Sequence, residues 1–165
     1  MDDFTPADAE FAERIHDSFR RLPLMQALGA ELRRVEAGRC EIATPCRTGL
    51  CAERGSVHPG ISAALADTAA GYAATSLLPR DAALVTVEHR LDFQSAAAGD
   101  ALVVEAKVER AGPSLIVVRA EVMAEQDGRR RTLAVKVATL MVARGPEAPF
   151  RSLWYFNEST SPVAA

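Results

Sequence analysis

Several features that mark large classes of protein are absent from this sequence. Acidic and basic residues are intermixed, and the net charge is only −3 at pH 7. A nucleic-acid surface needs a clustered basic face, so nucleic acid is not expected as a partner. The short basic run 129–131 follows the turn pair Asp127-Gly128 and is interpreted as a solvated hairpin tip. No apolar run reaches the roughly 18 to 20 residues of a membrane span without interruption, so no membrane partner is expected either.

Cysteine is scarce, and its number is odd. The three cysteines, Cys40, Cys46 and Cys51, follow no common zinc-binding spacing, and no histidine lies near enough in sequence to suggest a zinc site. The first residues do not resemble a signal peptide, so the cysteines fit a reducing cytosol better than a disulfide framework. We therefore expect a cytoplasmic protein that holds no metal and uses its cysteines as packing residues.

The 165 residues fit a single domain, and its first half is largely helical in pattern. Residues 6–22 place apolar side chains at three- and four-residue spacings, which predicts an amphipathic helix. Residues 29–45 predict a first strand with a turn or bulge at Ala37-Gly38. Residues 56–78 predict a helix that is apolar on all sides and therefore needs cover on all sides.

Beyond this helix the apolar period changes to two, which predicts β-strands. The four segments with this period are residues 84–94, 101–109, 114–125 and 132–143. Short turn sequences join them, so we expect an antiparallel meander that curls around the helix. In the first segment Val85, Val87 and His89 are expected on one face and Thr86 on the other. The apolar character of the last two segments predicts pairing with a second copy about a two-fold axis.

A single carboxylate, Asp67, interrupts the long apolar helix. Positions three, four and seven residues away share its side of the helix. They are all glycine or alanine: Gly60, Ala63, Ala64, Ala70, Gly71 and Ala74. A protein segment or a slender ligand can approach such a stripe closely. Burial of an unpartnered carboxylate is costly, so we interpret Asp67 as a catalytic nucleophile or general base. The structural alternative is that Asp67 caps another helix or pairs with an arginine.

The start of the helix offers a second chemical feature. His58 is expected as the N-cap residue and Pro59 as the first helical residue. This leaves the N–H groups of Gly60 and Ile61 free to hold an oxyanion. Gly60 and Asp67 lie about 10 Å apart along the helix axis. One chain therefore cannot easily bring both to a single carbonyl group, whereas a two-fold dimer can.

These residues resemble the motifs of the hotdog-fold acyl-CoA thioesterases, in particular the branch of the phenylacetate-degradation thioesterase. The resemblance lies in His58-Pro59-Gly60, in Leu65-Ala66-Asp67-Thr68-Ala69, and in segments 85–100 and 108–122. It spans roughly residues 28–143 and implies an α+β hotdog fold, in which a curved antiparallel sheet of about five to six strands wraps the long helix. Residues 1–27 remain as an N-terminal helix and lead-in. Residues 144–165 remain as a C-terminal extension, which we predict to pack on the body.

The resemblance also implies a reaction and a set of residues. The reaction is hydrolysis of an aryl- or medium-chain acyl-CoA thioester to free acid and CoA, with no cofactor, because CoA is part of the substrate. Asp67, Gly60 and His58 are the implied catalytic residues. Residues expected at the substrate are Ile61, Thr68, Tyr72, Thr86, Gly112 and Ser114, whereas His89 is expected to be an interior or interface histidine.

The implied assembly is a homodimer at minimum, with a dimer of dimers as the usual form. Two departures from the family pattern bear on activity. Ala52 stands six positions before His58, where the family usually has a polar residue. Pro59 stands where the family has a glycine, and it has no N–H to offer an oxyanion. The residues therefore keep open a second function, a non-catalytic acyl-CoA or small-ligand binding protein on the same scaffold.

Overall fold

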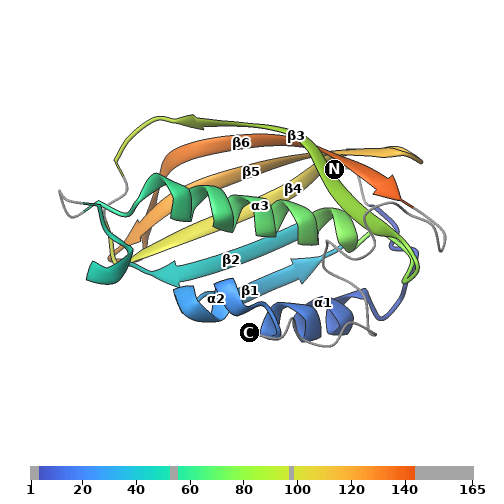
Figure 1. Cartoon of the computed structure of the whole chain (residues 1–165), viewed down its shortest axis with the longest axis horizontal. Coiled ribbons are helices and arrows are strands. Elements are labelled where there is room, and N and C mark those ends of the chain that lie inside the picture. The colour runs from blue at the N-terminus through green and yellow to red at the C-terminus, as the bar shows by residue number, and fades with distance from the viewer. Residues whose placement is uncertain (1–3, 53–55, 97–98, 144–165) are drawn as a thin grey trace, which may run out of the picture.

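A long helix lies across one face of a six-stranded antiparallel sheet (Figure 1). The computed structural model describes residues 4–52, 56–96 and 99–143. Its elements are α1 Phe11–Arg20, α2 Pro23–Leu28, β1 Glu31–Glu36, β2 Arg39–Pro45, the 3-10 helix η1 Thr48–Leu50, α3 Pro59–Thr75, β3 Ala83–Phe93, β4 Ala101–Ala111, β5 Leu115–Gln126 and β6 Arg129–Ala143. The α+β arrangement predicted from the sequence is confirmed. The predicted C-terminal extension, residues 144–165, lies outside the described residues.

The strand order is β1-β2-β4-β5-β6-β3, and each neighbouring pair is antiparallel. The predicted meander is confirmed for β4, β5 and β6 but is wrong for β3, which pairs with β6 at the edge of the sheet. β2 occupies the side of β4 that a meander would give to β3. The connection into β4 passes β5 closely, because Asp100 N–H donates to Glu125 O at 2.8 Å. A Cβ on Gly99 would come within 2.9 Å of that same oxygen, so glycine is required there.

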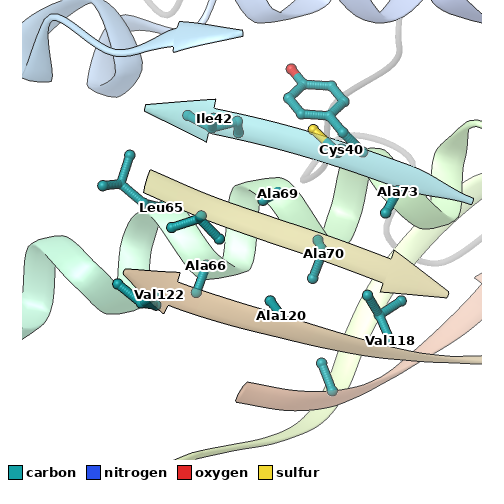
Figure 2. Packing of buried hydrophobic residues seen from close by; sticks show 14 of the residues in the cluster. Cys40, Ile42, Leu65, Ala66, Ala69, Ala70, Ala73, Val118, Ala120 and Val122 are labelled. Atoms are coloured by element: carbon teal, nitrogen blue, oxygen red, sulfur yellow. The ribbon is translucent and has the colours of Figure 1, made fainter. Parts of the chain in front are cut away.

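α3 packs on the sheet through small side chains. Four alanines that face β2, β4 and β5 are at most 1% exposed (Figure 2). They are Ala66, Ala69, Ala70 and Ala73. Because alanine lets the helix lie close to the strands, branched strand residues such as Ile42, Val118 and Val122 complete the layer. Close packing of this kind gives the dispersion contacts that hold the two layers together.

The cover of α3 is incomplete along one stripe. Gly60 is exposed, and Ala63, Ala64, Asp67 and Gly71 are half-buried. The prediction that the helix is covered on all sides is therefore wrong within one chain. Gly60, Ala63, Ala64 and Gly71 are four of the six small residues that the sequence places on the side of Asp67. The other two, Ala70 and Ala74, are buried at 1% and 0% exposure, so the prediction that they share the open stripe is wrong.

A β-bulge in β3 changes which residues face the helix. Thr86 lies opposite Leu140 and Glu88 opposite Thr139, so Val87 is an extra residue without a partner on β6. The bulge reverses the alternation, so that Thr86 shares a face with His89. The predicted face of Val85, Val87 and His89 is therefore wrong, since Val85 lies on the other side of the sheet.

The N-terminal part holds two helices where one was predicted. α1 is shorter than residues 6–22, and α2 follows it between Pro23, which suits a first helical position, and Gly29 at φ 65°. Ala37-Gly38 joins two strands, β1 and β2, as a hairpin turn. The tight β5–β6 hairpin is confirmed, with φ of 50° at Asp127 and 72° at Gly128.

None of the described helices is both long enough and apolar enough to cross a membrane.

Candidate active site

Asp67 lies in the middle of α3, on the side of the helix that faces β6 and β3. Its Oδ1 accepts a hydrogen bond from Lys136 Nζ. The Lys136 side chain is 1% exposed and the Asp67 side chain 26% exposed. His89 Nδ1 lies 3.9 Å from the same Oδ1, and its side chain is about half exposed. The structure thus brings together a carboxylate, a buried ammonium group and an imidazole, each from a different element.

The Asp67–Lys136 ion pair was not predicted. The sequence left open a structural pairing of Asp67 with an arginine, and the partner is a lysine that sequence reasoning overlooked. The sequence does contain a sign of this role for Lys136. Side chains alternate along β6, and Lys136 points to the same face as the buried residues Ala134, Ala138 and Leu140. A charged residue at an inward position of such a strand needs a partner on the facing element.

The second oxygen of Asp67 has different surroundings. Within the described part of the chain, Oδ2 accepts no hydrogen bond. The side chain lies in the half-buried stripe of α3, where its neighbours along the helix are Ala63, Ala64 and Gly71. The carboxylate is therefore anchored through one oxygen and retains access to solvent. This is the arrangement that a nucleophile or a general base requires.

The start of α3 is capped by His58. Its Nδ1 accepts the Gly60 N–H at 3.0 Å, and the Ile61 N–H donates to the His58 carbonyl oxygen at 2.9 Å. The prediction that both N–H groups are free is therefore wrong, because capping uses one and a tight helical turn uses the other. When neutral, a His58 ring that accepts at Nδ1 carries its proton on Nε2. Because His58 is exposed, Nε2–H is the donor that remains at this helix end.

His58 and Asp67 do not meet within one chain. Nine residues separate them on α3, which corresponds to about 13 Å along the helix axis. The predicted substrate residues at the β4–β5 turn are also distant. Leu115, next to Ser114, pairs with Met141 of β6. That position is five residues from Lys136, or about 17 Å along the strand.

Two of the predicted substrate residues are core residues. Tyr72 is 1% exposed, its hydroxyl forms a hydrogen bond with Ser18 Oγ at 3.1 Å, and its ring lies 6.1 Å from that of Phe19. Thr68 is 4% exposed, and its hydroxyl donates to Ala64 O at 2.9 Å. Within one chain both side chains are buried, and a substrate role for Tyr72 and Thr68 stays a prediction.

The remaining predicted residues lie at the surface. Ile61 and Thr86 are half-buried, as is Gly112, and Ser114 is exposed. Three surface hollows formed by described residues lie beside α1, at the β5–β6 hairpin and over β2 and β4, and none of them includes Asp67. Across residues 4–52, 56–96 and 99–143, no three histidine, cysteine, aspartate or glutamate side chains are grouped as a metal site requires. The site residues stay a prediction, of which Asp67 has the surroundings best suited to chemistry.

The chain is similar in sequence and in structure to known proteins. Residues 54–130 match the family model of the thioesterase superfamily. The chain is 30% identical over 133 residues to a protein of Halobacterium salinarum named "Putative esterase", with 78% of this chain and 85% of that protein covered. It is also similar to a thioesterase family protein of Silicibacter pomeroyi of known structure. That similarity is 38% identity at a TM-score of 0.79, over 82% of this chain and 99% of that one.

A third comparison concerns the fold alone. The PaaI protein from the phenylacetic acid degradation operon of E. coli is 23% identical, with a TM-score of 0.73, over 82% of this chain and 95% of that chain. The sheet order and the long helix of this chain thus accompany clear sequence similarity to a thioesterase family protein of known structure. The chain belongs to the thioesterase superfamily and has its hotdog fold.

Proposed function

We propose that this protein hydrolyses acyl-CoA thioesters and that Asp67 is the catalytic carboxylate. The proposal rests on how Asp67 is held on the central helix of a thioesterase fold. One of its oxygens is held by Lys136, while the side chain remains 26% exposed. A carboxylate of purely structural use has no need of that access. The expected substrates are aryl- or medium-chain acyl-CoA thioesters, and no cofactor is required.

Two routes balance chemically. As a nucleophile, Asp67 attacks the thioester carbonyl carbon, the C–S bond breaks, and CoA leaves as a thiolate that takes up a proton. Water then hydrolyses the acyl anhydride and regenerates the carboxylate. As a general base, Asp67 takes a proton from water while the resulting hydroxide attacks the same carbon, and CoA leaves in the same way. Both routes place negative charge on the carbonyl oxygen, which needs a hydrogen-bond donor.

We propose that this donor is the Nε2–H of His58 of the partner subunit in a homodimer. Support comes from the uncovered surfaces of the single chain. β3 is an edge strand, and its Val87 and Phe93 are each 52% exposed, which favours coverage by another copy. The half-buried stripe of α3 lies beside β3, because His89 Nδ1 is 3.9 Å from Asp67 Oδ1. On the outer sheet face, Leu115 and Val137 are 49% and 47% exposed and offer a second contact for a dimer of dimers.

The first experiment assays a panel of aryl, short-chain and long-chain acyl-CoA thioesters, with detection of the free CoA thiol. Asp67→Asn is expected to lower turnover by about 10²- to 10⁴-fold. Asp92→Asn is the matched control, because Asp92 is an exposed carboxylate on the other face of β3 and pairs with Arg90 at 2.9 Å. Turnover that survives Asp67→Asn would remove Asp67 from the mechanism.

A second experiment tests the shared site. Asp67→Asn and His58→Ala are each expected to lower turnover by about 100-fold or more, and mixing the two proteins gives heterodimers with one site that has both residues intact. Random exchange makes about half of the dimers heterodimers, so about a quarter of wild-type activity is expected to return. A mixture that stays as inactive as its components would place Asp67 and its oxyanion donor in one chain or refute the dimer.

The alternative function is a non-catalytic acyl-CoA or small-ligand binding protein. It is favoured by the absence of an N–H at Pro59 and by the internal hydrogen bonds of the Gly60 and Ile61 N–H groups. Calorimetric binding of the same thioesters without release of thiol, in the wild-type protein, would support this function over hydrolysis.

A further inference from the structure

We propose that Lys136 is a positioning residue that fixes the orientation of the Asp67 carboxylate and makes Oδ2 the reacting oxygen. This inference rests on the proposed function, because it assigns the way in which the same carboxylate is held. The Lys136 side chain is 1% exposed, so its ammonium group cannot itself reach a substrate from solvent. Any effect of Lys136 on the reaction must therefore act through Asp67.

The neighbours of Lys136 in the sheet are small. Lys136 is flanked on its own face of β6 by Ala134 and Ala138, and it lies opposite Ala120 on β5. These three alanines are at most 1% exposed, and Figure 2 shows Ala120 beneath α3. Small neighbours leave room for an extended lysine stem to run between sheet and helix.

The type of cation at this position is also specific. Only two of the 19 basic residues of the chain are lysines, Lys107 and Lys136; the others are arginines. A guanidinium group is wide and planar, whereas an ammonium group is compact and sits at the end of a linear stem. A passage lined by alanine methyl groups suits the ammonium group, and Asp67 Oδ1 is its acceptor.

The two contacts of Asp67 fall on the same oxygen. Lys136 donates to Oδ1 from the interior, and His89 Nδ1 lies 3.9 Å from Oδ1 at the half-exposed margin. Among the described residues no group donates to Oδ2, so this oxygen is left for the reactant. Loss of the anchor would let the carboxylate rotate, and a misplacement of about 1 Å at a reacting group can cost about 100-fold in rate.

Kinetics of Lys136→Met test this role. The variant is expected to lower kcat about 10- to 100-fold while KM changes less than about twofold. In an Asp67→Asn background, Lys136→Met is expected to cause no further loss. Leu140→Ala is the control for destabilisation, because Leu140 is a buried residue on the same face of β6; it is expected to lower the melting temperature but not kcat. Equal losses from Lys136→Met in both backgrounds would overturn the positioning role.

Nuclear magnetic resonance of protein labelled with 15N-lysine provides a readout that is independent of turnover. Lys107 is exposed, so its ammonium protons exchange rapidly and are not expected to be seen. The Lys136 ammonium group is expected to give a protected signal that Asp67→Asn shifts or abolishes. If the wild type hydrolysed no thioester, the proposed function would fail while this signal would still report the anchored carboxylate. A Lys136 ammonium group as accessible as that of Lys107 would overturn the inference, even in an active enzyme.

Discussion

Arg130 is the residue whose removal we expect to reveal most about the outer face of the sheet. Its guanidinium group contacts Glu41 at 2.9 and 3.2 Å, Glu105 at 2.6 Å and Glu125 at 3.0 Å. The sequence predicted a solvated basic run at this hairpin, which is wrong for Arg130. Its side chain is 32% exposed, and that of Glu41 only 10% exposed. Arg130→Met would leave Glu41 with Arg33, at 4.0 Å, as its remaining ion-pair contact among the described residues.

The expected loss follows from the burial of these groups. Removal of one partner of a fully buried ion pair costs roughly 3–5 kcal/mol, whereas exposed pairs contribute roughly 0–1 kcal/mol. Because Arg130 is about one-third exposed, we expect Arg130→Met to lower the free energy of unfolding by about 2–3 kcal/mol. For a chain of this length, that loss corresponds to a melting temperature lower by roughly 5–10 °C.

Urea unfolding monitored by circular dichroism measures this loss, and pH supplies a second test. Hydrogen bonds from Arg130, and then from Arg33, hold the pKa of Glu125 below its ordinary value of 4.5. A carboxyl group with a lowered pKa stabilises the fold above that ordinary value, and this stabilisation is lost as the pH falls through the lowered pKa. The difference between Arg130→Met and wild type should therefore be largest near neutral pH and shrink below about pH 4.

The adjacent Arg129→Met is the matched control, since Arg129 is exposed and forms no ion pair with the described residues. It is expected to change stability by no more than about 0.5 kcal/mol. A loss for Arg130→Met as small as that of Arg129→Met, or one that does not depend on pH, would refute the reasoning from burial.

Three further outcomes test the helix start and the core. His58→Ser keeps an N-cap oxygen but has no ring N–H, so we expect turnover to fall about 100-fold with little change in melting temperature. A fall in turnover that comes only with a large fall in melting temperature would mean that His58 only caps the helix. Pro59→Gly adds an N–H at the first helical position and is expected to preserve or raise turnover, whereas a collapse of turnover with the fold intact would make the proline part of the working site. Burial raises the pKa of the Cys40 thiol far above its ordinary value, so Ellman's reagent should modify Cys40 only after unfolding, and rapid labelling of native protein would contradict the burial.

The sequence predicts well those parts of the fold that depend on the local spacing of apolar residues. The apolar helix around Leu65 and the alternation in β4, β5 and β6 are visible in the residues themselves. The place of β3 is not, because its partner is decided by which edge of the sheet is free after β2 has paired with β4. The bulge at Val87 is also not encoded in the alternation, which continues through it without a break. A single inserted residue therefore moved Thr86 to the face of His89.

The candidate site was predictable to a similar, limited extent. Asp67 was found because a charge in an apolar helix is costly and conspicuous. Lys136 was not found, because a lysine in a strand is unremarkable until the inward parity of its position is taken into account. Tyr72 and Thr68 are expected at the substrate from the family resemblance, and a resemblance does not show what covers each side of the helix in this chain. α1 covers the Tyr72 side through Ser18 and Phe19.

The proposed dimer places a geometric demand on α3 that its sequence meets. In a two-fold contact, if residue i of one copy faces residue j of the other, then j also faces i. If His58 of one helix lies near Asp67 of the other, the axis passes close to the midpoint of that interval, at Ser62 and Ala63. Ser62 is buried in its own chain, whereas Ala63 is half-buried on the uncovered stripe. Two antiparallel helices can approach closely at such a point only if the side chains there are small. In this arrangement, the small residues beside Asp67 form the contact that brings the carboxylate to the helix start of the partner subunit.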